Sequence, residues 1–229
     1  MKRSDIEKSI GWAKEFLGEC GFRLPEFAYW SIGDWQANQH RIGLLKRLGL
    51  GWDVTDYGMG NFEEVGSILF TIRNGLYGDA NAGTPYAEKV IVIPDGQRLP
   101  MHYHASKTED IINRSGGQLF MKLYNALPDG EPDYESDVSV FRDGILYETP
   151  AGEEFLVGTG CSVSLTPRLY HIFGAKKGSG PLLVGEVSSI NDDKTDNYFY
   201  EQVARFTTIE EDIPVAVPLC NEYDRILGI

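Results

Sequence analysis

The spacing of apolar residues changes near Ser67, and the change divides this 229-residue chain into three parts. Before it, apolar residues recur with the period of helices that bury one face. From residue 67 to about 190, short apolar runs alternate with turn residues, which is typical of strands. The pattern predicts a single mainly β domain over residues 1–229. It would comprise a helical extension over 1–66, a β-barrel or sandwich over 67–190, and a C-terminal extension over 191–229.

Three helices are predicted in the first part. The first starts with a Ser-x-x-Glu capping box at Ser4 and Glu7. Its apolar residues form one stripe, namely Ile6, Ile10, Ala13 and Leu17. A second helix is expected over about 36–48 and a short third one over 62–65.

The second part should contain about ten short strands. They are expected at 68–72, 90–93, 119–124, 138–141, 145–148, 155–157, 162–165, 170–173 and 182–187. Asn74-Gly75 and Asp143-Gly144 are typical hairpin turns between such runs. In the last part Pro214 and Pro218 favour an extended segment that wraps over the surface or over a partner subunit.

Composition narrows the possible functions. The formal net charge of −13 argues against nucleic acid or an anionic membrane as partner, and favours a neutral small molecule such as a sugar. No apolar run is long enough to cross a membrane, and the N-terminus lacks the apolar core of a secretory signal. Three widely spaced cysteines fit neither a disulfide framework nor a zinc site, so a reducing cytoplasm is expected.

Three of the four histidines fall in the predicted β part. His102 and His104 are two residues apart, so on a strand both imidazoles face one side. Glu109 can return to them after a bend at residues 105–106, and His171 follows on a later strand. A His-x-His pair alone is more often a surface or packing feature, but three imidazoles and a carboxylate together suit a borderline divalent ion. His40, in the helical part, we interpret as structural.

These residues carry a resemblance to the cupin superfamily. Its first motif is a glycine, five residues, His-x-His, three or four residues, a glutamate, six residues and a glycine. The chain has the residues of this motif without a gap, at Gly96, His102, His104, Glu109 and Gly116. The second motif, Pro-x-Gly-x-x-His, is matched only at its histidine, because Leu169 stands at the glycine position before His171. The resemblance implies a cupin (jelly-roll type) β-barrel with His102, His104, Glu109 and His171 as metal ligands.

The chain resembles one cupin family more closely, the D-lyxose isomerases, through residues 101–114 and 185–193 and its helical N-terminus. That resemblance implies a homodimeric, manganese-dependent aldose–ketose isomerase. It would convert D-lyxose to D-xylulose and usually D-mannose to D-fructose. The ligand types also accommodate Fe²⁺, Co²⁺, Ni²⁺ or Zn²⁺.

An isomerase also needs a proton shuttle, for which Glu186 is the first candidate because a carboxylate in an apolar strand needs a partner or a task. Glu201, beside aromatic residues, is the second. Lys107 and Lys89 are candidates for binding the sugar, and Lys107 also for stabilising negative charge. Each has an ordinary alternative as a solvated or turn residue, and Asp110 fits a supporting role.

Two other functions suit the same ligands. One is an iron-dependent cupin dioxygenase, and the other is a sugar-binding or storage cupin without turnover. The residues alone barely separate the three, and the family resemblance favours the isomerase.

Overall fold

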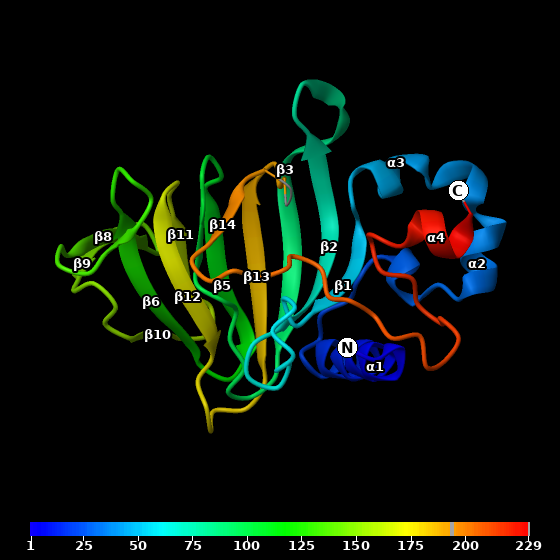
Figure 1. The fold of residues 1–229 in the computed structure, drawn as a ribbon, viewed down its shortest axis with the longest axis horizontal. Coiled ribbons are helices and arrows are strands. Elements are labelled where there is room, and N and C mark those ends of the chain that lie inside the picture. Colours follow the sequence, from blue (N-terminus) through cyan, green and yellow to red (C-terminus); the bar gives the residue numbers. More distant parts are fainter. Residues whose placement is uncertain (193–194, 229) are drawn as a thin grey trace.

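The computed structural model of the protein describes residues 1–192 and 195–228. Two antiparallel sheets curl against each other, and the helices gather at one end (Figure 1). The larger sheet has the order β1-β2-β3-β13-β5-β11-β8-β9. Its strands are β1 (Gly51–Thr55), β2 (Ser67–Leu76), β3 (Asp79–Ile93), β5 (Glu109–Gly116), β8 (Val138–Arg142), β9 (Ile145–Thr149), β11 (Ser162–Leu165) and β13 (Leu182–Ser189).

The second sheet has the order β10-β6-β12-β4-β14, with β7 paired to β6. Its strands are β4 (His102–His104), β6 (Leu119–Ala126), β7 (Pro132–Asp133), β10 (Phe155–Val157), β12 (Leu169–Ala175) and β14 (Asn197–Phe199). Side chains from both sheets form the main core, among them Ile91, Ile111, Leu123, Val163 and Phe173. Burying aliphatic side chains of this kind contributes roughly 1.5–3 kcal/mol each. The predicted mainly β architecture is confirmed.

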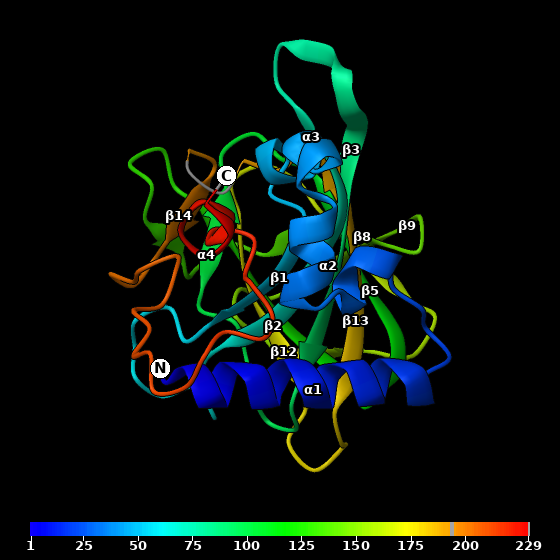
Figure 2. The same cartoon turned by 90° about the vertical axis from the view of Figure 1, so that its right-hand side faces the viewer.

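Strand β3 is buried on both faces at residues 90–93. Ile91 and Ile93 point into the barrel, whereas Val90 and Val92 pack in the cluster that includes the helix α1 (Arg3–Glu19). The helix crosses the outer side of the first strands (Figure 2). An antiparallel strand often keeps one face in water. Here the helix covers that face, which explains why this part of the sequence is continuously apolar.

The start of α1 differs from the prediction. Lys2 precedes its first turn, and the predicted capping box is not made. Ser4 instead donates its hydroxyl to Asp212 at 2.6 Å. Glu7 accepts the backbone N–H groups of Ala216 and Val217. Both side chains are used to hold the C-terminal segment against the helix.

The rest of the first part is less helical than predicted. Residues 36–48 lie in three short pieces rather than one helix, since Asn38 and Gly43 favour helix ends and turns over a helix interior. These pieces are α2 (Ile32–Ala37), the 3₁₀ helix η2 (Gln39–Arg41) and α3 (Gly43–Arg47). A further 3₁₀ helix, η1 (Glu26–Tyr29), precedes them. Residues 62–64 form a turn, Val65 makes an isolated β-bridge with Arg98, and the sheet already begins with β1.

The predicted turn at Asn74-Gly75 is also wrong, because both residues lie inside β2 and the chain turns at Tyr77-Gly78. Pairing between β2 and β3 is irregular around Gly75. A Cβ atom on Gly75 would lie 2.0 Å from the Thr84 carbonyl oxygen. The glycine is therefore required by a close approach of two backbones rather than by a turn.

The C-terminal segment wraps back over the molecule, as predicted. After β14 it runs past α1 and ends in α4 (Tyr223–Leu227). There the rings of Tyr223 and Trp35 pack with centroids 4.8 Å apart. Among the described residues, no helix has the length and apolar character needed to cross a membrane.

Candidate metal and active site

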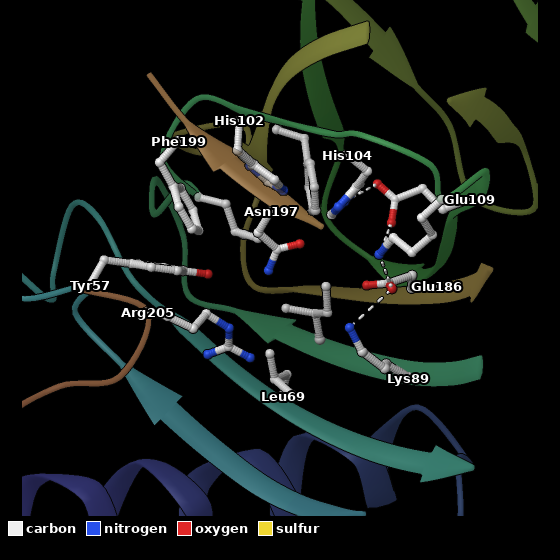
Figure 3. A pocket seen from close by; sticks show the side chains of 14 residues that line it. Tyr57, Leu69, Lys89, His102, His104, Glu109, Glu186, Asn197, Phe199 and Arg205 are labelled. Atoms are coloured by element: carbon white, nitrogen blue, oxygen red, sulfur yellow. Dashed lines mark hydrogen bonds and ion pairs between the residues drawn. The ribbon is translucent and has the colours of Figure 1, made fainter. Parts of the chain in front are cut away.

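Strand β4 directs His102 and His104 into a cavity between the sheets (Figure 3). Tyr103 faces the opposite way, as strand alternation predicts. Its ring packs against Tyr170 and Tyr198, with centroid distances of 4.7 and 5.0 Å. An aromatic cluster therefore supports the histidine pair from behind.

His171 and Glu109 lie at the same place. Strand β12 pairs with β4 so that His171 is opposite His102, and their Nε2 atoms are 3.0 Å apart. Glu109 Oε1 lies 3.3 Å from Nε2 of both His104 and His171. The three imidazoles form a group whose ligand atoms all lie within 4.8 Å of one another. Although the second cupin motif is matched only at its histidine, sheet pairing places His171 beside the histidines of the first motif.

The bend between β4 and β5 returns Glu109 to the histidines. The buried Asp196 fixes this bend: its carboxylate accepts the N–H and hydroxyl of Ser106 at 2.8 and 2.7 Å and the N–H of Lys107 at 3.2 Å. Asp196 belongs to the segment before β14, far along the chain. No local motif marks it, so the sequence analysis missed it.

Two of the imidazoles are held in the tautomer that binds a metal. Nδ1 of His102 donates to the Pro100 carbonyl oxygen at 2.8 Å, and Nδ1 of His171 donates to that of Leu169 at 3.0 Å. Each Nε2 therefore presents a lone pair to the cavity. Burial lowers the pKa of His171 to about 4 and the pKa of His102 well below its usual value, so both rings are neutral at pH 7.

These residues fit a divalent metal ion. Two neutral Nε2 atoms at 3.0 Å repel each other unless a cation lies beside them. Glu109 Oε1 is buried and has no hydrogen-bond partner among the described residues, although a buried carboxylate oxygen normally has one. For bonds of roughly 2.1 Å, adjacent ligand atoms are ~3.0 Å apart in an octahedron and ~3.4 Å in a tetrahedron. The observed separations of 3.0 and 3.3 Å agree with either geometry.

A row of alternating charges continues from Glu109 along the cavity wall. Glu109 Oε2 lies 2.7 Å from Lys107 Nζ, which in turn donates to Glu186 Oε1 at 3.0 Å. Lys89 Nζ lies 3.2 Å from the same Glu186 oxygen and donates to Asn191 Oδ1 at 2.7 Å. Lys107, Glu109 and Glu186 are almost fully buried, as is Lys89. The predicted candidates Glu186, Lys107 and Lys89 therefore share one cavity with His102, His104 and Glu109.

This pairing keeps the buried groups ionised. Burial alone would raise the pKa of Glu186, but the charges of Lys107 and Lys89 hold it below its ordinary value. Burial alone would also raise the pKa of Glu109, but Lys107 and His104 hold it well below its usual range. Burial would lower the pKa of Lys107, and its two carboxylate partners raise it instead. Glu186 is thus available as a base at neutral pH.

The other end of the cavity is lined by side chains that the sequence analysis did not select. These are Tyr57, Asn197, Phe199 and Arg205. Three of them come from the C-terminal segment. In the sequence, only the aromatic residues near 198 indicated that this segment reaches the cavity. Glu201, in contrast, is exposed and does not line the cavity. Asp110 points elsewhere and accepts the Ser164 hydroxyl, and His40 is exposed on η2.

Comparison with known proteins identifies relatives of the whole chain. The family described as D-lyxose isomerase matches residues 1–223. The chain belongs to the D-lyxose isomerase family. A D-lyxose/D-mannose isomerase of Escherichia coli O157:H7 is 43% identical over 227 residues, which cover 97% of this chain and 98% of that protein. A D-lyxose/D-mannose isomerase of Serratia proteamaculans is 41% identical over the full length of both.

Solved structures agree on the fold. An L-ribose isomerase of Geodermatophilus obscurus superposes with a TM-score of 0.59 at 17% identity. An L-ribose isomerase of Acinetobacter sp. DL28 in complex with L-ribose gives a TM-score of 0.57 at 15% identity. Each comparison covers 92% of this chain and 98% of the other. The predicted cupin-type barrel is confirmed. Membership of the D-lyxose isomerase family makes the chain an aldose–ketose isomerase rather than a dioxygenase or a storage protein.

Proposed function

We propose that this isomerase interconverts D-lyxose and D-xylulose, and also D-mannose and D-fructose, with Mn²⁺ as its cofactor. The names of the two relatives above 40% identity supply the aldoses. One observation carries the mechanism. A buried, ionised carboxylate, Glu186, lines the same cavity as His102, His104 and Glu109. His171 lies against these residues, and Glu109 Oε1 has no hydrogen-bond partner among the described residues.

His102, His104, His171 and Glu109 would hold the ion. A divalent metal held there would polarise the sugar carbonyl and would stabilise negative charge on the sugar oxygens. Lys107 holds Glu109 Oε2 and thereby leaves Oε1 facing the imidazoles. We choose Mn²⁺ because the family resemblance implies it and because it accepts the Glu109 carboxylate and sugar oxygens as ligands. Fe²⁺, Co²⁺, Ni²⁺ and Zn²⁺ are to be compared with it because affinity alone favours the later metals.

Glu186 acts as the proton shuttle. Its carboxylate takes the proton from C2 of the open-chain aldose, and the electrons of that bond form the C1–C2 double bond of an enediolate. A hydroxyl proton passes from O2 to O1, and Glu186 returns its proton to C1. The carbonyl is then at C2, which is the ketose. Lys89, held by Asn191, keeps the Glu186 carboxylate in place.

Lys107 has a second task in this scheme. Its ammonium lies between Glu109 and Glu186, next to the place where negative charge appears on the sugar oxygens. Positioned cationic donors in a buried cavity stabilise such charge strongly, because little water competes with them. Lys107 therefore both orients the ligand Glu109 and binds the reacting end of the sugar.

The cytoplasmic location and the homodimer expected from the sequence are part of this proposal. The location is supported by the small, odd number of widely spaced cysteines, which suits a reducing compartment. Size-exclusion chromatography with light scattering would test the dimer.

The test of the function is an anaerobic sugar assay. Protein stripped of metal is reloaded with each of the five ions and incubated with D-lyxose or D-mannose without oxygen. We expect the matching ketose, with the highest rate for Mn²⁺. If no ketose forms with any of the ions, the proposal is wrong. Ketose formation that is fastest with another ion overturns only the choice of metal.

A further inference from the structure

The chain just beyond β13 is held by the end of β2 through the side chain of Asn74. The Oδ1 atom of Asn74 accepts the Asn191 N–H at 3.0 Å, and its Nδ2 group donates to the Asn191 carbonyl oxygen, also at 3.0 Å. The same Nδ2 group donates to the Leu48 carbonyl oxygen at 3.3 Å. Asn74 is only 5% exposed. Its amide therefore does for Asn191 what the main chain of a neighbouring strand would do.

Two neighbours of Asn74 contact Ile190 on the same segment. The Tyr77 hydroxyl donates to the Ile190 carbonyl oxygen at 3.0 Å. Gly75 lies so close that a Cβ atom on it would be 3.1 Å from the Ile190 side chain. The Asn-Gly pair at 74–75, which is typical of a hairpin turn in sequence, thus fastens residues 190–191 instead.

Asn191 depends on these hydrogen bonds for its position. It lies two residues past the end of β13 and so outside the ladders that hold that strand. Asn74, Ile190 and Asn191 also border a second cavity of about 750 Å³ beside α3 and α4. A residue at the wall of a cavity lacks packing contacts on one side. The hydrogen bonds from Asn74 therefore decide where the side chain of Asn191 points.

The side chain of Asn191 reaches the active site through Lys89. Its Oδ1 atom accepts from Lys89 Nζ at 2.7 Å, and this Nζ atom lies 3.2 Å from Glu186 Oε1. Lys107 Nζ lies 3.0 Å from the same Glu186 oxygen, and Figure 3 shows both contacts on one oxygen. Within the described residues, Glu186 Oε2 has neither a hydrogen bond nor an ion pair. Two ammonium groups thus hold one oxygen of the carboxylate and leave the other to the cavity.

We propose that Asn74 and Asn191 are positioning residues for the proton transfer. They set Lys89 on Glu186 Oε1 and leave Oε2 to carry the proton. This inference rests on the proposed function, in which Oε2 would take the proton from C2, the electrons of that C–H bond would form the C1–C2 double bond, and Oε2 would return the proton to C1. Held by Lys107 alone, the carboxylate could turn about its last bond. The second cation fixes its plane, and proton transfer requires such a fixed geometry.

The experiment is a double-variant cycle on kcat. Asn191→Leu keeps the size of the side chain but removes the acceptor for Lys89. It should lower kcat for D-lyxose by about 10- to 100-fold, because a small misplacement of a reacting group has an effect of that order, and leave KM within about threefold. Lys89→Met should lower kcat by at least as much. The double variant should be no slower than Lys89→Met alone, because Asn191 acts only through Lys89.

Asn38→Leu is the matched control for this cycle. The Oδ1 atom of Asn38 accepts from Arg41 Nε at 2.6 Å, so the same kind of bond between an amide and a cation is lost, but in the helical part. We expect the kcat and KM of wild type. A loss of kcat in Asn38→Leu equal to that in Asn191→Leu would indicate a general effect on folding and overturn the inference.

Asn74→Leu extends the test to the residue that holds Asn191. It should lower kcat in the same range, again with no further loss when it is combined with Lys89→Met. The substitution also removes partners from the main chain of Asn191, so kcat is expressed per folded, metal-loaded chain. If Asn74→Leu does not fold, Asn191→Leu decides the inference, because its main-chain contacts remain.

Three results would overturn the inference. A normal kcat in Asn191→Leu would mean that Lys89 needs no support. Losses that multiply in the double variant would mean that Asn191 acts independently of Lys89. A raised KM with unchanged kcat would place Asn191 in sugar binding rather than in proton transfer.

Failure of this inference can be separated from failure of the proposed function. If the wild type makes no ketose with any metal ion, the function is wrong whatever the variants do. If the wild type makes ketose and Asn191→Leu makes it equally fast, only the inference is wrong.

Discussion

One cluster of buried charge lies beside α1, and another lies inside the barrel. Arg3 is completely buried, and its guanidinium is bound on both sides. It donates to both oxygens of Glu211 at 2.9 Å and to both oxygens of Glu222 at 3.0 and 2.6 Å. In the barrel, Glu109 Oε1 is also buried but has no hydrogen-bond partner within residues 1–192 and 195–228.

The difference separates a structural cluster from a functional one. The Arg3 cluster is closed: every guanidinium contact goes to a carboxylate, and it fastens α1 to the C-terminal segment. The barrel cluster borders a cavity and leaves ligand atoms facing it. Because burying an unsatisfied polar atom destabilises a protein, such atoms persist where a ligand completes them. Substitutions in the first cluster should therefore change stability, and those in the second should change chemistry.

The largest effect is expected from Glu186→Gln. Loss of a general base typically slows the reaction by about 10²- to 10⁴-fold, while metal content should be unchanged. Glu201→Gln is the matched control, because Glu201 is exposed. Steady-state kinetics with D-lyxose and metal analysis of both variants provide the measurement. A normal rate in Glu186→Gln together with a slow Glu201→Gln would move the shuttle to Glu201.

Arg3→Met should show the opposite behaviour. Removing one partner of a buried ion pair costs about 3–5 kcal/mol, since the carboxylate of Glu222 is left in a buried position. Denaturant unfolding should reveal this loss, and the double variant Arg3→Met/Glu222→Gln should recover part of it. The kcat per folded molecule should remain close to wild type. If Arg3→Met has normal stability but a low kcat, the Arg3 cluster is not purely structural and the distinction between the two clusters is wrong.

The smallest effect concerns acid pH at the Arg3 cluster. Hydrogen bonds from Arg3 lower the pKa of Glu211 to about 2 from its ordinary 4.5. The resulting stability is present above pH 4.5 and is lost as pH falls towards 2. It should not exceed about 1 kcal/mol, because more than a third of the side chain is exposed to solvent. Urea unfolding of wild type and Glu211→Gln should differ at pH 6, and the difference should be smaller at pH 3 and disappear below about pH 2. A constant difference would contradict the assignment.

The parts of the site that could be predicted depend on short-range geometry. Strand alternation alone places His102 and His104 together, and fixed motif spacing adds Glu109. Lys107 lies two residues before Glu109, so it shares the same region. His171 was the only histidine left in the barrel. The strand that lies beside His171 is set by long-range sheet pairing, and only the family resemblance indicated that His171 joins the other ligands.

The far end of the cavity could not be predicted, because its residues meet only through long-range pairing. Arg205 and Asp53 are separated by 152 positions. Asn197 reaches the cavity because β14 pairs with β4, and no local pattern fixes that register. Strand β5 was missed for a different reason: its inward residues include Glu109 and Asn113, so functional and polar side chains conceal the apolar alternation.

Metal stoichiometry tests the central claim most directly. Wild type, His104→Ala and the exposed control His40→Ala are dialysed against Mn²⁺ and then against metal-free buffer, and metal per chain is measured by elemental analysis. We expect one ion per chain in wild type and in His40→Ala, and almost none in a folded His104→Ala. One full ion per chain in His104→Ala, or none in wild type, would contradict a metal site built from the unsatisfied ligands of the barrel.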